Sequence, residues 1–337
     1  MTSFLSKYGK ALFWVGFLVF ALVFLKLQPP LTGFTLGSHH DFLSGHGLAV
    51  SAGTSLAKPF QMYDGRYLSD SDTLVYSRFP FWPFYLTEAV SSAMSDNLAD
   101  KIKWSRRQMA LWYLLAALFC FLAMAYVLKD QLQAAVATAM AFTSHYILFY
   151  HEMIFNDVPA LFGCTLVFWA FVRPKDKRTN LTRILAILAS LSLGWQPLTV
   201  LVSFLVYETF LLKDEGGWGF KHMLIGLGVA GLTVAGNLMA NLVAESYMVG
   251  VPFTELPTVK SMLMRFGFDE SFNQAQAATL GWPQFLQTQL TYIGRSALPK
   301  SVGGVRPTWG QGSSSLLLDF YWSVKRLWLC FLCLSVV

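Results

Sequence analysis

The chain has 337 residues and a formal net charge of +6, with 55% hydrophobic, 16% aromatic and only 13% charged residues. Soluble domains carry about 25% charged residues, so this composition argues against a soluble domain and favours a chain that crosses the bilayer several times. The excess of Lys and Arg lies in short segments between apolar runs, where membrane topology explains it better than nucleic-acid binding does.

Apolar stretches predict a series of membrane-spanning helices in chain order. They cover 11–28, 108–128, the stretch from the Lys129-Asp130-Gln131 turn to Tyr150, 158–173 and 223–243. A long polar segment, 29–106, separates the first two of these helices. A short polar tip, 151–157, separates the third from the fourth.

Residues 184–212 are apolar except for the break Gly194-Trp195-Gln196-Pro197 and the late Glu208. One kinked helix and two short helices both fit this pattern. Two helices would leave Lys213 and Lys221 in the cytoplasm, and the distribution of positive charge therefore favours two.

The C-terminal part contains a second large loop followed by a short apolar run. Residues 327–337 are too few to cross about 30 Å of hydrocarbon, as expected for a spanning helix cut inside a longer protein. We therefore expect an all-α polytopic membrane protein, C-terminally truncated, with two large extracytoplasmic loops. Its parts are a transmembrane core that includes the first loop, a second loop and the start of a further helix (1–245, 246–325 and 326–337).

Positive residues in the short connections set the expected orientation. Lys7 and Lys10, Lys129, and the basic run from Arg173 to Arg183 all fall on one side of the predicted spans. Because Lys and Arg are enriched in cytoplasmic loops, the N-terminus is expected in the cytoplasm, and 29–106 and 151–157 outside it.

Acidic residues follow the first span and occupy the next outward tip. Asp41 stands in Gly37-Ser38-His39-His40-Asp41, and Glu152 and Asp157 lie in 151–157. Acids near the bilayer are costly, and two that converge on one lipid-facing cleft would suit a general base or a metal site. Structural roles stay open: Asp41 as a helix cap, Asp157 as a first-turn acid, and Glu152 as a solvated interfacial acid.

Four motifs occur in a recognisable order. Asp41 follows the first span, and the aromatic-proline run Arg78-Phe79-Pro80-Phe81-Trp82-Pro83 precedes an apolar stretch. Asn156-Asp157-Val158-Pro159 opens a helix, and Gly194-Trp195-Gln196-Pro197 breaks the fifth apolar region. In this order the chain resembles the GT-C superfamily of membrane glycosyltransferases over about 11–245. The protein O-mannosyltransferases and aminoarabinose transferases are the most similar groups. Gln196 stands where those families often carry Lys.

The resemblance implies a GT-C-like helical bundle that transfers a sugar from a polyprenyl-phosphate carrier. The acceptor hydroxyl would belong to a protein, a lipid or a glycan on the extracytoplasmic face, in the periplasm or the ER lumen. Asp41 would act as the base. Asp157 would either hold a divalent metal (Mn, Mg or Zn), with Glu152 as a second ligand, or order the neighbours of Asp41. His40, Arg78 and Arg295 are the candidate substrate-binding residues.

Two other classes of function remain open. A transporter would place charged residues and broken helices at mid-membrane, often in repeated halves, whereas here the ionisable residues gather in outer segments and no repeat is evident. The second class is a non-catalytic, GT-C-like assembly subunit with a degenerate site.

Overall fold

The computed structural model describes single residues of the first predicted span, most of the region 38–259 and none of the C-terminal part. The described residues are 17, 21, 38–52, 62–63, 74–75, 79–143, 150–173, 178–211, 219–256 and 258–259. The chain divides into two compact units, Met1–Met248 and Val249–Val337. Apart from Phe17 and Ala21, which are helical, the predicted helix 11–28 lies outside the described residues, as do 260–337.

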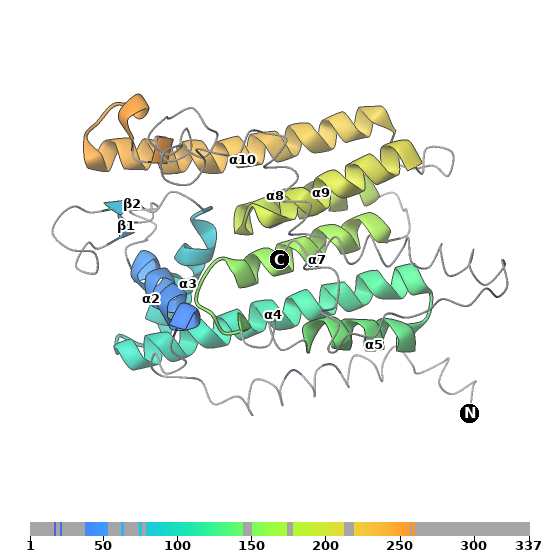
Figure 1. Cartoon of the computed structure of the whole chain (residues 1–337), viewed down its shortest axis with the longest axis horizontal. Helices are drawn as coiled ribbons and strands as arrows, with labels where there is room; N and C mark the ends of the chain where they lie inside the picture. The colour runs from blue at the N-terminus through green and yellow to red at the C-terminus, as the bar shows by residue number, and fades with distance from the viewer. Residues whose placement is uncertain are drawn as a thin grey trace, which may run out of the picture. The chain divides into compact units, whose positions relative to one another are not determined.

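The described part of the chain is helical almost throughout, which confirms the predicted all-α class (Figure 1). One short antiparallel pair, β1 (Met62–Tyr63) with β2 (Leu74–Val75), is the exception among these residues. Helices α4 (Leu98–Leu128) and α10 (Phe220–Val249) are long and apolar enough to cross a membrane.

The segment 29–106, expected to be a polar loop, contains helices and ends earlier than expected. It holds α2 (Ser38–Ala52) and α3 (Trp82–Met94), and α4 begins at Leu98 instead of at 108. The Asn97 side chain caps α4 by accepting a hydrogen bond from the Ala99 N–H at 2.8 Å. Hydropathy missed this first part of α4 because its polar residues interrupt the apolar run, although they do not interrupt the helix.

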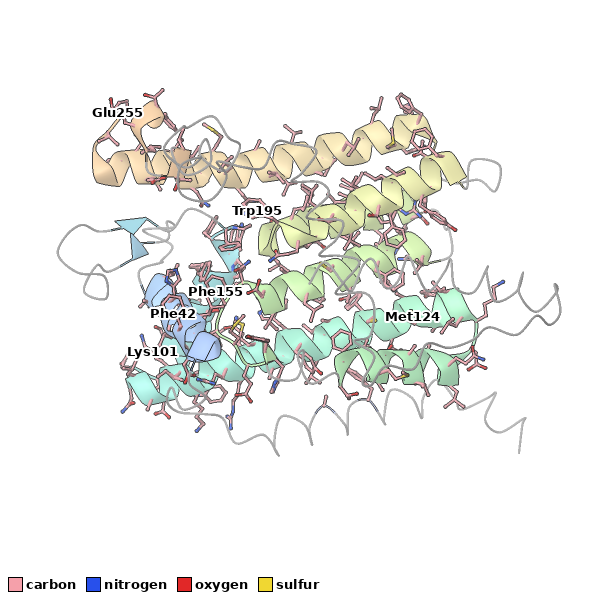
Figure 2. The ribbon with its side chains drawn as sticks, in the orientation of Figure 1. Phe42, Lys101, Met124, Phe155, Trp195 and Glu255 are labelled. Atoms are coloured by element: carbon pink, nitrogen blue, oxygen red, sulfur yellow. The ribbon has the colours of Figure 1, made fainter. Side chains whose placement is uncertain are left out.

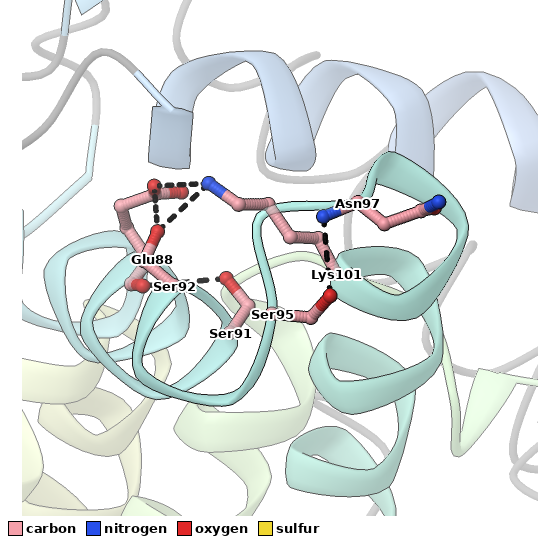
Figure 3. Close-up of polar contacts among 6 residues, drawn as sticks. All are labelled: Glu88, Ser91, Ser92, Ser95, Asn97 and Lys101. Atoms are coloured by element: carbon pink, nitrogen blue, oxygen red, sulfur yellow. Dashed lines mark hydrogen bonds and ion pairs between the residues drawn. The ribbon is translucent and has the colours of Figure 1, made fainter.

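A polar cluster fixes the corner between α3 and α4 (Figure 3). Lys101 lies 3.1 Å from the Glu88 carboxylate and donates to the Ser92 hydroxyl at 2.8 Å. The Asn97 N–H donates to Ser95 at 3.1 Å. These groups are partly exposed, so each ion pair contributes little stability, but together they orient the start of α4.

The connection after α4 has the tight form that the sequence predicted. Lys129 adopts a left-handed conformation with φ of 57°, and Asp130 caps α5 (Gln131–Phe142) by accepting from the Gln133 N–H at 2.9 Å. Twelve helical residues rise about 18 Å, which is less than the hydrocarbon thickness. The rest of the third predicted helix, 144–149, lies outside the described residues.

Helix α7 (Asp157–Val172) occupies the centre of the larger unit and confirms the predicted helix 158–173. It packs against α4, α8 and α9. Aromatic pairs join it to α4, with ring centroids 5.2 Å apart for Trp112 and Phe162 and 5.1 Å for Phe119 and Trp169. Gly163 permits the close approach of α8 and α9, since a Cβ there would lie 2.8 Å from Pro197 and 3.1 Å from the Ser190 carbonyl oxygen.

The described part of 184–212, which ends at Leu211, forms two helices, the alternative that the charge pattern favoured. They are α8 (Thr179–Leu193) and α9 (Gln196–Val206), followed by the π-helical turn η2 (Tyr207–Leu211). Arg183, near the start of α8, pairs with Glu208, just beyond α9, so the two helices run back along each other. Arg183 was counted among the exposed loop charges; it is instead fully buried.

Helix α10 extends the predicted helix 223–243 at both ends. Much of its apolar surface is exposed, including Leu232 at 78%. The Asn241 side chain joins it to the start of the α3 region by donating to the Phe79 carbonyl at 2.9 Å. In the second unit the short 3-10 helix η4 spans Phe253–Glu255.

Candidate functional site

The centre of the site is Arg106, a fully buried guanidinium on α4. Its Nη2 lies 3.6 Å from Asp41 Oδ1, and its Nη1 lies 3.9 Å from Glu152 Oε2. Asp41 occupies the first turn of α2, where the helix dipole also favours a carboxylate. Three segments far apart in sequence therefore bring two acids to one arginine.

Glu152 is not the solvated interfacial acid that the sequence suggested. It is buried at 7% exposure, with Oε1 3.4 Å from His151 Nε2, and the whole segment 151–156 is buried. The His151 ring also meets Tyr113 on α4 edge to face, with centroids 5.5 Å apart. The expectation failed because the segment is short and polar in sequence, whereas α2 covers it in space.

Contacts with α2 hold the segment 151–156 in place. The Ile154 N–H donates to the Ser44 hydroxyl at 3.2 Å. A Cβ on Gly47 would lie 1.7 Å from the Ile154 carbonyl oxygen, so only glycine permits this approach. Val50 of α2 shares a buried apolar cluster with Met153 and Phe155. The backbone that follows Glu152 is thus held against α2.

Among the described residues, this cluster holds more acids than permanent cations. Two carboxylates, Asp41 and Glu152, face one permanent cation, and His151 is the titratable neighbour of Glu152. A carboxylate in this setting can accept a proton from a hydroxyl group.

Asp157 lies at the first position of α7, beside the start of α9. The Gln196 side chain donates to Asp157 Oδ1 at 3.1 Å, and this bond joins two of the predicted motifs. Figure 2 shows Phe155, just before the first of these motifs, and Trp195, within the second, toward the end of the helices where Lys101 lies. Met124 lies toward the other end of α4. Asp41 and Asp157 are linked through Arg106, Glu152 and the buried segment 151–156.

The candidate substrate-binding residues are less well described. His40 lies in α2, one residue before Asp41, and its side chain is not among those described. Arg78 precedes the first described residue of the aromatic-proline motif, and Arg295 lies in the second unit; both lie outside the described residues. The structure therefore brings Asp41 and Glu152 to Arg106 and joins Asp157 to Gln196, whereas the side chains of His40, Arg78 and Arg295 lie outside the described part of the chain.

The geometry does not fit a metal ion shared by the acids around Arg106. The guanidinium itself lies between Asp41 and Glu152, where a bridging cation would bind. Within the described ranges, no group of three or more His, Cys, Asp or Glu side chains could hold a metal.

Sequence reasoning missed Arg106 and the bond from Gln196 to Asp157. Arg106 was assigned to the end of a loop, although a charged residue that directly precedes an apolar run is a signal in itself. Its neighbour Arg107 carries the same signal yet stacks over the Trp104 ring at 4.8 Å. Only the fold shows which of the two arginines faces the acids.

No protein-family model, curated protein or solved structure matches the chain.

Proposed function

We propose that the chain is a multi-pass membrane glycosyltransferase with a GT-C-like bundle. It moves a sugar from a polyprenyl-phosphate carrier to an acceptor hydroxyl on the extracytoplasmic face. The observation that carries this proposal is the buried cluster of Asp41, Arg106 and Glu152 toward one end of the long apolar helix α4. A lipid-borne donor requires a polar centre next to surfaces that lipid can cover.

In this proposal Asp41 is the catalytic base. The acceptor O–H gives its proton to the Asp41 carboxylate, and the acceptor oxygen forms a bond to the anomeric carbon. The bond between that carbon and the phosphate oxygen breaks, and the polyprenyl phosphate leaves with the electron pair. Arg106 acts as a positioning residue, because its contact at 3.6 Å orients the carboxylate while Glu152 holds the guanidinium from the other side.

Apolar side chains on the outside of the helices support a membrane setting for this chemistry. On α5, Leu132 and Met140 are 74% and 73% exposed, and on α10 Leu232 is 78% exposed. Exposed apolar surface of this extent is typical of helices that lipid covers. The carrier tail would lie along such a surface. The N-terminus would face the cytoplasm, and the cluster around Arg106 the opposite side.

Transfer assays with Asp→Asn variants test the proposal. In membranes supplied with a polyprenyl-phosphate sugar, Asp41→Asn is expected to lower the transfer rate by about 100-fold or more, since general-base catalysis contributes about 10²–10⁴-fold. Asp157→Asn is expected to lower it less. Asp96→Asn, a change at an exposed position, is the matched control.

Wild-type transfer rates in both Asp41→Asn and Asp157→Asn would refute the site assignment. Sidedness offers a second refutation. Labels on cysteines placed at Ser95 and Lys129, beyond the two ends of α4, must react from opposite sides of the membrane.

The alternative of a non-catalytic assembly subunit is favoured by one observation. Arg106 is fully buried between its two acids, as a purely structural ion cluster would be. In that case Asp41→Asn would lower the stability of the chain, and the wild-type chain would show no transfer.

A further inference from the structure

Asn156 is a fully buried side chain whose amide makes no hydrogen bond. Both Nδ2 and Oδ1 lack a hydrogen-bond partner within the described part of the chain, and the residue is 0% exposed. It stands at the N-cap of α7, where Asn commonly accepts a bond from the helix, but it makes no such capping bond. A buried polar group left unsatisfied is costly, so this amide calls for an explanation.

A second unsatisfied group lies in the neighbouring motif. Gln196 donates through Nε2 to Asp157, the residue after Asn156, while its Oε1 is buried and accepts no hydrogen bond. Gly194 leaves room for this oxygen, because a Cβ there would lie 2.8 Å from Gln196 Oε1 and 2.5 Å from the Ala160 Cβ. Two amides from adjoining helix starts thus carry buried polar atoms that make no hydrogen bond within the described part of the chain.

The chemistry of these atoms selects a neutral hydroxyl-bearing ligand. The three unsatisfied atoms are one NH₂ donor and two carbonyl acceptors. An anion would use only the donor and would be repelled by Asp157, and an ammonium group would use only the acceptors. A hydroxyl group both donates and accepts, so hydroxyl groups suit a set that contains both kinds of atom.

We propose that Asn156 and Gln196 form a subsite that binds hydroxyl groups of an uncharged sugar. The inference rests on the proposed function, because the sugar would be the group carried by the polyprenyl phosphate. Asp157 and Gln196 are partly exposed, so the sugar would approach past them and reach Asn156 last. The unsatisfied amide of Asn156 is then the stability cost of a site formed in advance.

Binding measurements on the full chain in detergent test this subsite. The probes are polyprenyl phosphate mannose, polyprenyl phosphate glucose and bare polyprenyl phosphate. Wild type is expected to bind at least one sugar-bearing carrier more tightly than the bare carrier. Asn156→Leu is expected to reduce that advantage by about tenfold, the loss for about 1.4 kcal/mol of hydrogen bonding, and to leave binding of the bare carrier unchanged.

Thermal unfolding without ligand separates this role from a purely structural one. Asn156→Leu removes an unsatisfied amide and is expected to raise Tm by about 2–4 °C. Ser190→Ala is the matched control, because the Ser190 hydroxyl is also buried without a hydrogen bond but belongs to α8, where its backbone packs against Gly163. It is expected to raise Tm similarly and to keep the full preference for the sugar-bearing carrier.

The outcomes are distinguishable. Equal affinity of the wild type for bare and sugar-bearing carriers overturns the subsite, as does an unchanged sugar preference in Asn156→Leu, which would mean that Asn156 binds water only. Failure of the wild type to bind any of the three carriers overturns the proposed function itself, and the subsite with it.

Discussion

Two buried arginines differ sharply in how the chain satisfies them. Arg183 donates to both Glu208 oxygens, at 2.7 and 2.5 Å, and to the carbonyls of Ala170 and Phe171 at 3.3 and 3.0 Å. Its guanidinium also lies 4.5 Å from the Phe171 ring centroid. Arg106 instead faces its two acids at 3.6 and 3.9 Å, longer than the roughly 2.7–2.9 Å of charge-assisted hydrogen bonds.

The comparison separates a structural arginine from one suited to function. Arg183 closes the end of α7 and ties α8 to the turn after α9, so that these contacts serve packing. Around Arg106 and the start of α7, by contrast, long ion pairs and unbonded amides accumulate. Buried polar groups with unmet hydrogen bonds are expected where a protein binds or reacts with something else.

The largest effect is expected from breaking the Arg183 pair. Arg183→Ala leaves Glu208 buried without its counter-charge, and the free energy of unfolding should fall by about 3–5 kcal/mol. Denaturant or thermal unfolding in detergent measures this loss. Transfer activity per folded molecule should stay near that of the wild type.

A double variant separates the contribution of the ion pair from that of the carbonyl contacts. Arg183→Met with Glu208→Leu removes both charges together, and should recover most of the lost stability, because apolar replacement of a buried pair is often nearly neutral. A double variant as unstable as Arg183→Ala would mean that the bonds to the α7 carbonyls contribute more than the pair.

The sequence predicted correctly some helix ends at which a capping residue, a glycine or a proline stands. The turn after α4 follows from Asp130 as a cap, and the break between α8 and α9 from Gly194 and Pro197. The early start of α4 was missed because hydropathy detects only helices with a continuous apolar surface. The first turns of α4 carry polar residues, and α2 and its neighbours bury Ile102 and Arg106 there.

The candidate site was predicted only in part, for a physical reason. Asp41 and Asp157 stood out because acids beside apolar runs are rare. Arg106 and the burial of Glu152 depend on α2 folding over the segment 151–156, through Gly47 and Ser44, and no local pattern encodes that contact.

Substitution of Arg106 tests whether this arginine serves function as well as stability. Arg106→Met leaves Asp41 and Glu152 without their cation, and should lower stability by about 3 kcal/mol and kcat by about 100-fold or more, with a smaller change in KM. Arg106→Lys keeps the charge but not the two-pronged geometry, and should rescue stability more than kcat.

Arg107→Met is the control for the Arg106 variants, because Arg107 stacks on Trp104 one residue away. It should leave kcat within about twofold of the wild type, because Arg107 is partly exposed and substitutions outside the core usually change little. Equal losses of kcat in the Arg106 and Arg107 variants would show that disturbance of α4, and not the ion cluster, lowers the rate. If Arg106→Met destabilises the chain but leaves kcat unchanged, Arg106 is structural like Arg183.

The smallest effect concerns the packing that brings the starts of α7 and α9 together. Gly163→Ala places a Cβ 2.8 Å from Pro197 and 3.1 Å from the Ser190 carbonyl oxygen, so the helices must separate, at a cost of about 1–3 kcal/mol. Because Pro197 follows Gln196, the separation should also weaken the bond to Asp157 and lower transfer. Gly231→Ala on α10 meets nothing within 4 Å and should instead gain up to about 1 kcal/mol from helix propensity. Thermal unfolding of the two variants side by side distinguishes them, and equal stability would mean that the close approach at Gly163 does not hold α7 against α9.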